Sequence, residues 1–186
     1  MKGFFIVLEG TEGCGKSTQA KLLYKKLKEE GLSSLLTKEP GGTALGNKLR
    51  TLVKRGGSIF PEAELLLFNA SRSQLVKEVV LPALAEGKVV ISDRFYPSTM
   101  AYQGYGRGLE SHIIEILNDF ATAGLKPDMI VLLDLDAQKG LSRKPSCGKD
   151  RFEEEEAEFH RKVRKGYLAM AKQEPERWLL LDASQN

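Results

Sequence analysis

Cysteine, histidine and tryptophan are scarce in this sequence. Its 186 residues include two cysteines, two histidines and one tryptophan. Cys14 and Cys147 lie far apart, and neither belongs to a CxxC or CxxH pattern. These absences argue against a disulfide scaffold and give no zinc-site spacing. We therefore expect a protein of the reducing cytoplasm.

Long hydrophobic runs and a large excess of one charge are also absent. No apolar run approaches the roughly 20 residues of a membrane-spanning helix, and the apolar stretch of residues 1–9 is too short for a signal peptide. The 28 basic and 25 acidic residues leave a net charge of only +3. Binding a nucleic-acid polymer by charge alone needs a larger, clustered excess. We expect no membrane or nucleic-acid partner, and small anions as ligands.

Short apolar runs alternate with longer segments that have a helical period. This alternation predicts an α/β fold in which helices cover a parallel sheet. The length suits a single domain over residues 1–186. The predicted strands are residues 4–9, 34–38, 88–92, 128–134 and 178–182.

Three longer segments are predicted to be helices. Residues 16–30 and 61–86 place leucines on one face, and Pro82 should disturb the second helix near its end. Residues 152–172 are predicted to begin with an acidic run that suits the helix dipole. The basic stretch 142–151 contains proline and glycine and lacks an apolar face. It is predicted to be a mobile loop.

Residues 10–17 match the P-loop pattern GxxxxGK(S/T) between a predicted strand and a predicted helix. Glycines let the backbone N–H groups of such a loop point at phosphate oxygens. Lys16 would reach the β- and γ-phosphates, and the Ser17 hydroxyl could bind Mg²⁺. The sequence therefore predicts a nucleoside triphosphate site. Its expected residues are Gly10, Thr11, Glu12, Gly13, Cys14, Gly15, Lys16, Ser17 and Thr18.

A P-loop alone does not distinguish a switch protein from a kinase. A GTPase reads guanine with NKxD after a strand, whereas residues 47–50 read NKLR and follow no predicted strand. That route to guanine is excluded. A kinase of a small phosphorylated acceptor needs further cations for the acceptor phosphate and a lid against water. Both a kinase and a nucleotide-gated ATPase remain open at this point.

A second set of candidate anion-binding residues follows the predicted strands. Asp93 and Arg94 come at the end of the third strand, where ligands of open α/β sheets bind. Arg50 could reach the same cleft from a helix that begins near Thr43. Phe68 and Arg72 share one helix face, which pairs a ring for stacking with donors for a base edge.

Together these segments resemble the bacterial-type thymidylate kinases over essentially the whole chain. The most specific segments are EPGGT at 39–43, DRFYPS at 93–98 and AYQG at 101–104. The resemblance implies a P-loop kinase fold with a five-stranded parallel sheet in the order 2-3-1-4-5 and a short lid at about 142–151. It also implies a homodimer and transfer of the γ-phosphoryl group of MgATP to dTMP, giving dTDP and ADP. The alternatives are another nucleoside monophosphate kinase, or a P-loop ATPase that acts through a protein partner.

By the same resemblance, Phe68 would stack on thymine, Arg72 would bond its edge and Gln103 would line the base pocket. Glu12 would approach the sugar 3′-hydroxyl, and Tyr102 would occupy the space of a ribose 2′-hydroxyl. Two arginines, Arg50 and Arg94, would hold the dTMP phosphate. The complete expected acceptor set is Glu12, Glu39, Arg50, Phe68, Arg72, Arg94, Ser98, Tyr102 and Gln103.

The resemblance also implies how the reaction is catalysed. Positions 11–14 of the P-loop carry no basic residue, and in this family the lid then supplies the catalytic cations. Ser17 and Asp93 would hold Mg²⁺, and Arg143 would act on the phosphates or stack on adenine. The lid candidates are Arg143, Lys144, Lys149 and Arg151, and the expected catalytic residues are Lys16, Asp93, Arg94, Arg143 and Arg151.

Overall fold

A five-stranded parallel sheet in the order β2-β3-β1-β4-β5 forms the centre of the molecule. The computed structural model describes residues 3–55, 57–143 and 151–185. The strand order confirms the expected α/β architecture. The strands are β1 (Phe4–Glu9), β2 (Ser34–Lys38), β3 (Val89–Asp93), β4 (Met129–Asp134) and β5 (Trp178–Asp182).

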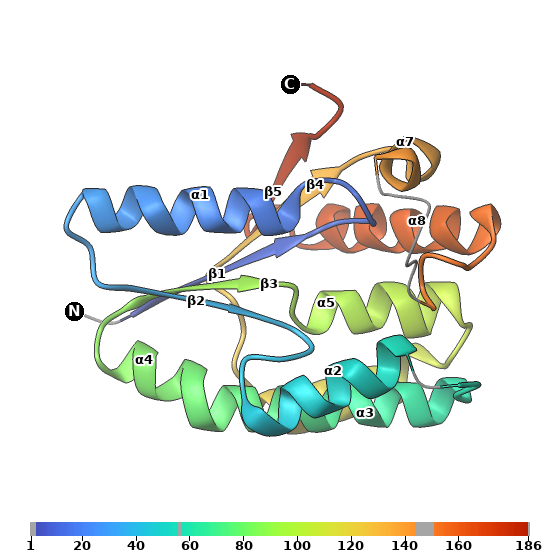
Figure 1. Ribbon diagram of the computed structural model, residues 1–186, viewed down its shortest axis with the longest axis horizontal. Coiled ribbons are helices and arrows are strands. Elements are labelled where there is room, and N and C mark those ends of the chain that lie inside the picture. Colours follow the sequence, from blue (N-terminus) through green and yellow to red (C-terminus); the bar gives the residue numbers. More distant parts are fainter. Residues whose placement is uncertain (1–2, 56, 144–150, 186) are drawn as a thin grey trace.

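Helices cover both faces of the sheet. Figure 1 shows α1 above the sheet, with α2, α3 and α4 below it. The α-helices are α1 (Lys16–Glu29), α2 (Ala44–Arg55), α3 (Pro61–Leu75), α4 (Leu81–Ala85), α5 (Tyr96–Thr99), α6 (Ser111–Thr122), α7 (Ala137–Ser142) and α8 (Ala157–Gln173). Two wider turns of π-helix, η1 (Val76–Val80) and η2 (Met100–Gly106), continue α3 and α5.

The central strand β1 contributes to two hydrophobic clusters. Phe5 and Val7 are fully buried in a cluster that includes Val76 of η1. Leu8 points to the other face and packs with Ala20 of α1. Successive side chains of a strand point to opposite faces, so a strand covered on both sides is apolar at nearly every position. The carboxyl end of this buried strand leads directly into the P-loop.

Pro82 disturbs the long predicted helix as expected. The regular α-helix α3 ends at Leu75, and the Leu81 N–H bonds to the Val76 carbonyl, five residues back. Proline has no N–H, and its ring crowds the carbonyl four residues earlier, so the preceding turn widens. The segment 61–86 is therefore three helical pieces rather than one.

The prediction that a helix spans residues 152–172 is wrong at its start. Helix α8 begins at Ala157, and the acidic run precedes it. Phe152 is instead buried in a cluster with Tyr102, and Glu155 forms an ion pair with Arg107. These tertiary contacts hold residues 152–155 in a turn at the edge of the site. Smaller differences are that β3 includes Asp93 and that β4 begins after Asp128.

Candidate nucleotide and acceptor site

One cavity of about 360 Å³ lies between the P-loop, the ends of β2 and β3, and helices α2 and α3. Most of the expected residues line it: Glu12, Gly13, Gly15, Lys16, Ser17, Thr18, Glu39, Arg50, Phe68, Arg72, Asp93, Arg94, Ser98, Tyr102, Gln103 and Arg143. Four expected residues do not line it: Gly10, Thr11, Cys14 and Arg151. Lining residues that the sequence analysis did not select include Lys38, Val53, Lys54, Thr99 and Phe152.

The P-loop forms a tight turn at the N-terminus of α1. Gly15 caps the helix with a φ of 95°, and among the described residues no side-chain cap binds the first N–H groups of the helix. The Lys16 ammonium lies 2.7 Å from the Thr11 carbonyl oxygen and is almost fully buried. A side chain at Gly13 would collide with the backbone of Gly140 in α7. The turn is thus fixed against α7 and presents a preformed anion site.

Ser17 and Asp93 meet at the mouth of the cavity. The Ser17 hydroxyl donates a short hydrogen bond to the Asp93 carboxylate. This pair of hard oxygen atoms fits Mg²⁺, which uses few protein ligands beside substrate phosphates and waters. In the described part of the chain, no cluster of three or more His, Cys, Asp or Glu could hold a metal ion on its own.

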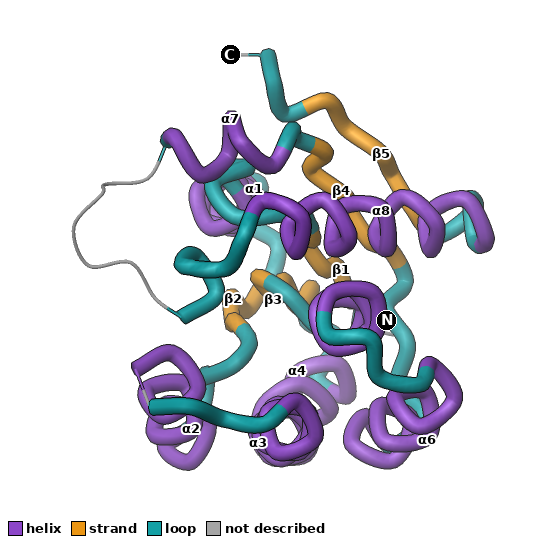
Figure 2. Tube along the Cα trace, turned by 90° about the vertical axis from the view of Figure 1, so that its right-hand side faces the viewer, coloured by secondary structure: helices purple, strands orange, loops and turns teal. Residues whose placement is uncertain are grey.

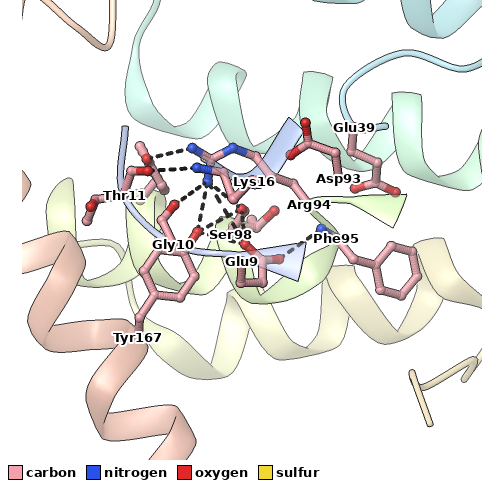
Figure 3. A network of polar contacts seen from close by, with 12 residues as sticks. Glu9, Gly10, Thr11, Lys16, Glu39, Asp93, Arg94, Phe95, Ser98 and Tyr167 are labelled. Carbon is pink, nitrogen blue, oxygen red and sulfur yellow. Dashed lines mark hydrogen bonds and ion pairs between the residues drawn. The ribbon is translucent and has the colours of Figure 1, made fainter. Parts of the chain in front are cut away.

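Arg94 is the centre of a polar network (Figure 3). Its Nη1 donates to the hydroxyls of Ser98 and Tyr167, both at 3.0 Å. Its Nη2 donates to Glu12 at 2.8 Å and to the Tyr102 hydroxyl at 3.0 Å. Arg94 also has a φ of 77°, which is uncommon for a residue other than glycine. The network therefore holds the guanidinium in one place beside the P-loop.

Glu9 lies behind this network with no exposed surface. It accepts hydrogen bonds from the Phe95 N–H at 2.9 Å, the Ser98 hydroxyl at 2.7 Å and the Tyr167 hydroxyl at 2.9 Å. Burial raises the pKa of the Glu9 carboxyl, although Arg94 at 4.0 Å acts in the opposite direction. The sequence analysis missed this role. The sequence feature that could have indicated this role is the position of Glu9, a carboxylate at the end of an otherwise apolar strand.

Arg72 lines the cavity, yet only 1% of its surface is exposed. Its guanidinium donates to Glu39 at 2.8 Å, Asn118 at 2.7 Å and Thr99 at 2.8 Å. A longer hydrogen bond of 3.4 Å reaches Asn69. Because the hydrogen bond to Asn69 is the longest of the four, an acceptor atom of a base could replace it with the smallest loss of free energy. Arg72 is therefore held rigidly rather than extended freely into the cavity.

Glu39 is a buried carboxyl on the cavity wall. Burial raises its pKa to about 7, despite the nearby Arg72 guanidinium, and the negative charge of Glu9 contributes to the rise. Its Oε2 accepts the Arg72 bonds, whereas its buried Oε1 has no hydrogen-bond partner among the described residues. This group can change its charge near neutral pH inside the cavity.

Aromatic side chains also line the cavity. The half-buried Phe68 ring lies 5.9 Å from the Phe152 ring, and the two planes are inclined by 52°. The Tyr102 ring packs edge-on against Phe152, also with 5.9 Å between centroids. Gln103 is buried beside them and donates to Glu64. These residues offer flat apolar surface and one amide.

The remaining predicted cations differ in position. Arg50 lies on α2, which Thr43 caps through its hydroxyl, and Arg50 donates to the Pro40 carbonyl at 2.9 Å. Arg143 lines the cavity and donates to the Ala183 carbonyl at 3.1 Å. Arg151 instead pairs with Glu64, away from the cavity lining. Lys144 and Lys149 fall outside the described residues.

The sheet order, the P-loop and the cations that line the same cavity define a P-loop phosphotransferase. A family model described as thymidylate kinase matches residues 8–186. The chain therefore belongs to the thymidylate kinase family.

The individual proteins that the chain resembles are also thymidylate kinases. A thymidylate kinase of Caldanaerobacter subterraneus subsp. tengcongensis is 49% identical over 186 residues, which cover 100% of this chain and 89% of the relative. One from Dehalococcoides mccartyi is 52% identical over 182 residues, covering 97% and 88%. The crystal structure of thymidylate kinase from Ehrlichia chaffeensis matches with a TM-score of 0.83 at 34% identity, covering 97% of this chain and 93% of that one.

Proposed function

We propose that this protein transfers the γ-phosphoryl group of ATP to dTMP, forming dTDP and ADP, with residues 1–186 acting as one domain. The observation that carries this proposal is a single cavity lined both by the P-loop and by Arg50, Arg72 and Arg94. Two phosphate-bearing substrates can meet there. Phosphoryl transfer asks the protein mainly for positioning and for charge stabilisation.

On the nucleotide side, the P-loop backbone binds the phosphates and Lys16 stabilises charge on the transferred group. The loop residues in this role are Gly10, Thr11, Glu12, Gly13, Cys14, Gly15, Lys16, Ser17 and Thr18. Ser17 and Asp93 would hold Mg²⁺, which when bound neutralises phosphate charge. Of the two lid cations that the structure describes, Arg143 and Arg151, Arg143 lines the cavity, which supports a catalytic role or stacking on adenine.

On the acceptor side, Phe68 stacks on the thymine ring and Arg72 binds its edge. Arg50 and Arg94 hold the dTMP phosphate, and Ser98 keeps Arg94 in place. Glu12 faces the sugar 3′-hydroxyl, Tyr102 fills the space beside the 2′ carbon, and Gln103 and Glu39 complete the wall. The fixed positions of Arg94 and Arg72 support this assignment because a preorganised guanidinium loses little freedom when the substrate binds.

ADP release in the presence of different acceptors tests the function. A coupled assay with dTMP, dUMP, UMP, dCMP, AMP and GMP should give the highest kcat/KM with dTMP. Another nucleoside monophosphate kinase would prefer a different acceptor. An ATPase that works through a protein partner would release ADP at a rate independent of dTMP.

Replacing Tyr102 by alanine should weaken discrimination against ribonucleotides. Tyr102 is 6% exposed, and its hydroxyl donates to Glu12 at 2.8 Å. Removing the ring opens space for a 2′-hydroxyl, so the ratio of kcat/KM for dUMP over UMP should fall by roughly tenfold. Tyr102→Phe keeps the ring and serves as the control with a nearly unchanged ratio. An unchanged ratio in Tyr102→Ala would remove Tyr102 from the sugar site.

The affinity for dTMP should depend on the ionisation of Glu39. Because its folded-state pKa is raised to about 7 from 4.5, ionisation lowers the free energy of unfolding as pH rises from about 4.5 through 7. It also adds negative charge to the wall of the cavity that binds the dTMP dianion. The ratio of the wild-type KM for dTMP to that of Glu39→Gln should therefore rise about fivefold from pH 6 to pH 8. The titration of dTMP itself affects both KM values equally and therefore cancels in the ratio. A ratio that does not change with pH would contradict this expectation.

The protein would act in the cytoplasm as a homodimer. Helices α3 and α6 pack side by side along one edge of the molecule (Figure 2) and expose apolar side chains. Leu66 is 55%, Ile116 55% and Phe120 81% exposed, a patch that supports association. Light scattering should give twice the 20.6 kDa of one chain. In the described part of the chain, no helix is long and apolar enough to cross a membrane.

A further inference from the structure

Glu64 is a carboxylate with no exposed surface on the first turn of α3, and the reaction outlined above does not use it. Three side chains donate to it. The Gln103 Nε2 atom lies 2.6 Å from Oε1, and the Arg107 Nε and Nη2 atoms each lie 3.4 Å from a carboxylate oxygen. Arg151 forms a short contact with Oε2. One buried carboxylate thus joins two guanidinium groups to an amide on the wall of the acceptor cavity.

The two arginines are themselves fixed by other contacts. Arg107 pairs with Glu155 at 2.6 Å, and its guanidinium carbon lies 4.7 Å from the centre of the Phe159 ring. Arg151 donates from Nε to the Val53 carbonyl at 3.2 Å. A carboxylate between two such groups has little freedom to turn. It can accept hydrogen bonds but has no proton to donate.

This geometry determines which way the Gln103 amide faces. Its NH₂ end must point at Glu64, because the opposite orientation would place two buried oxygen acceptors against each other. Its carbonyl Oε1 is then left without a hydrogen-bond partner among the described residues. Since Gln103 is 1% exposed and lines the cavity, the amide offers the cavity a fixed acceptor.

A fixed acceptor in the cavity that the Arg72 donors also line matches only some base edges. Thymine and uracil present the O4 acceptor next to the N3–H donor. Cytosine reverses both groups, with an amino donor at C4 and an acceptor at N3. A site that leaves buried polar groups unpaired rejects the wrong ligand strongly. The pair formed by Arg72 and Gln103 therefore favours the first two bases.

We propose that Glu64 is a positioning residue that sets the choice of base: by holding the Gln103 amide with its carbonyl toward the cavity, it makes the site accept thymine or uracil and reject cytosine. Arg107 and Arg151 keep the carboxylate in place, which gives Arg151 a role outside the cavity. This inference rests on the proposed function, because it assumes that the cavity binds a nucleotide base.

The test measures equilibrium affinities for dTMP and dCMP by calorimetry, together with kcat and KM for dTMP. In Glu64→Gln the residue at 64 can donate as well as accept, so the Gln103 amide can turn. The ratio of dTMP to dCMP affinity should fall by roughly 10- to 100-fold. The KM for dTMP should rise, while kcat at saturating dTMP stays within about twofold.

Glu155→Gln is the matched control. It removes an ion pair from the same Arg107 without touching Gln103, so the affinity ratio should stay at the wild-type value. Gln103→Met leaves Glu64 with both arginines and should lower the ratio as Glu64→Gln does. In the Gln103→Met protein, the additional substitution Glu64→Gln should cause almost no further change in the ratio of dTMP to dCMP affinity.

Three results would overturn the proposal. They are a wild-type affinity ratio in Glu64→Gln, a wild-type ratio in Gln103→Met, or equal losses in Glu64→Gln and Glu155→Gln. If Glu64→Gln does not fold, the affinity ratio of Gln103→Met still shows whether the Gln103 amide distinguishes thymine from cytosine. The proposed function has a separate test, because it fails if the wild-type protein does not phosphorylate dTMP. Even then, the calorimetric ratio of dTMP to dCMP affinity still tests the role of Glu64.

Discussion

Replacing Lys16 by methionine is expected to lower kcat by a factor on the order of 10² to 10³ while the protein stays folded. The ammonium lies 2.7 Å from the Thr11 carbonyl in the P-loop and is 6% exposed. In the proposed reaction it is therefore preorganised where negative charge develops on the transferred phosphoryl group. Methionine preserves the length and packing of the side chain but removes the charge. The affinity for dTMP should change little, since that substrate binds across the cavity.

Single-turnover kinetics and a dTMP titration separate these effects. Lys21→Met makes the same chemical change at an exposed position of the same helix, so it should keep wild-type kcat. Thermal unfolding of both variants should remain close to that of the wild type. If Lys16→Met turned over at a near-normal rate, the P-loop would not be the site of phosphoryl transfer.

The features that follow from local sequence were predicted well. The apolar strands, the P-loop between β1 and α1, and Pro82 each carry their signal within a few neighbouring residues. The helical spacing of Phe68 and Arg72 correctly placed both on the cavity wall. The strand order came from the family resemblance, because pairing of distant strands leaves no local pattern.

The contacts that hold the site together could not be read from the sequence. Arg72 shows the difficulty, because its partners Glu39, Thr99 and Asn118 lie on three other segments. The start of α8 was misplaced for a similar reason. The acidic run suits a helix N-terminus, but burial of Phe152 competes with local preference and prevails. Likewise Arg151 forms an ion pair with Glu64, which is far away in the sequence, so no local pattern predicts this contact.

Replacing Arg94 by alanine is expected to reduce both activity and stability. The guanidinium binds Glu12, Ser98, Tyr102 and Tyr167, and stands 4.0 Å from the buried Glu9. Without it, the acceptor phosphate loses a fixed cation, and kcat/KM for dTMP should fall by a factor on the order of 10³. Removing one partner of a buried charge pair costs about 3–5 kcal/mol. The free energy of unfolding, measured in urea, should fall by about that amount.

The double variant Arg94→Ala/Glu9→Gln separates the two losses. The neutral amide at position 9 can still accept from the Phe95 N–H, which Glu9 binds at 2.9 Å, but it leaves no buried carboxylate unpaired. Much of the stability should therefore return while kcat/KM stays low, because the Arg94 cation is still missing from the phosphate site. Arg177→Ala, which breaks an exposed ion pair with Glu174, should change neither quantity by much. Recovery of activity together with stability in the double variant would mean that Arg94 acts through the fold and does not bind the substrate.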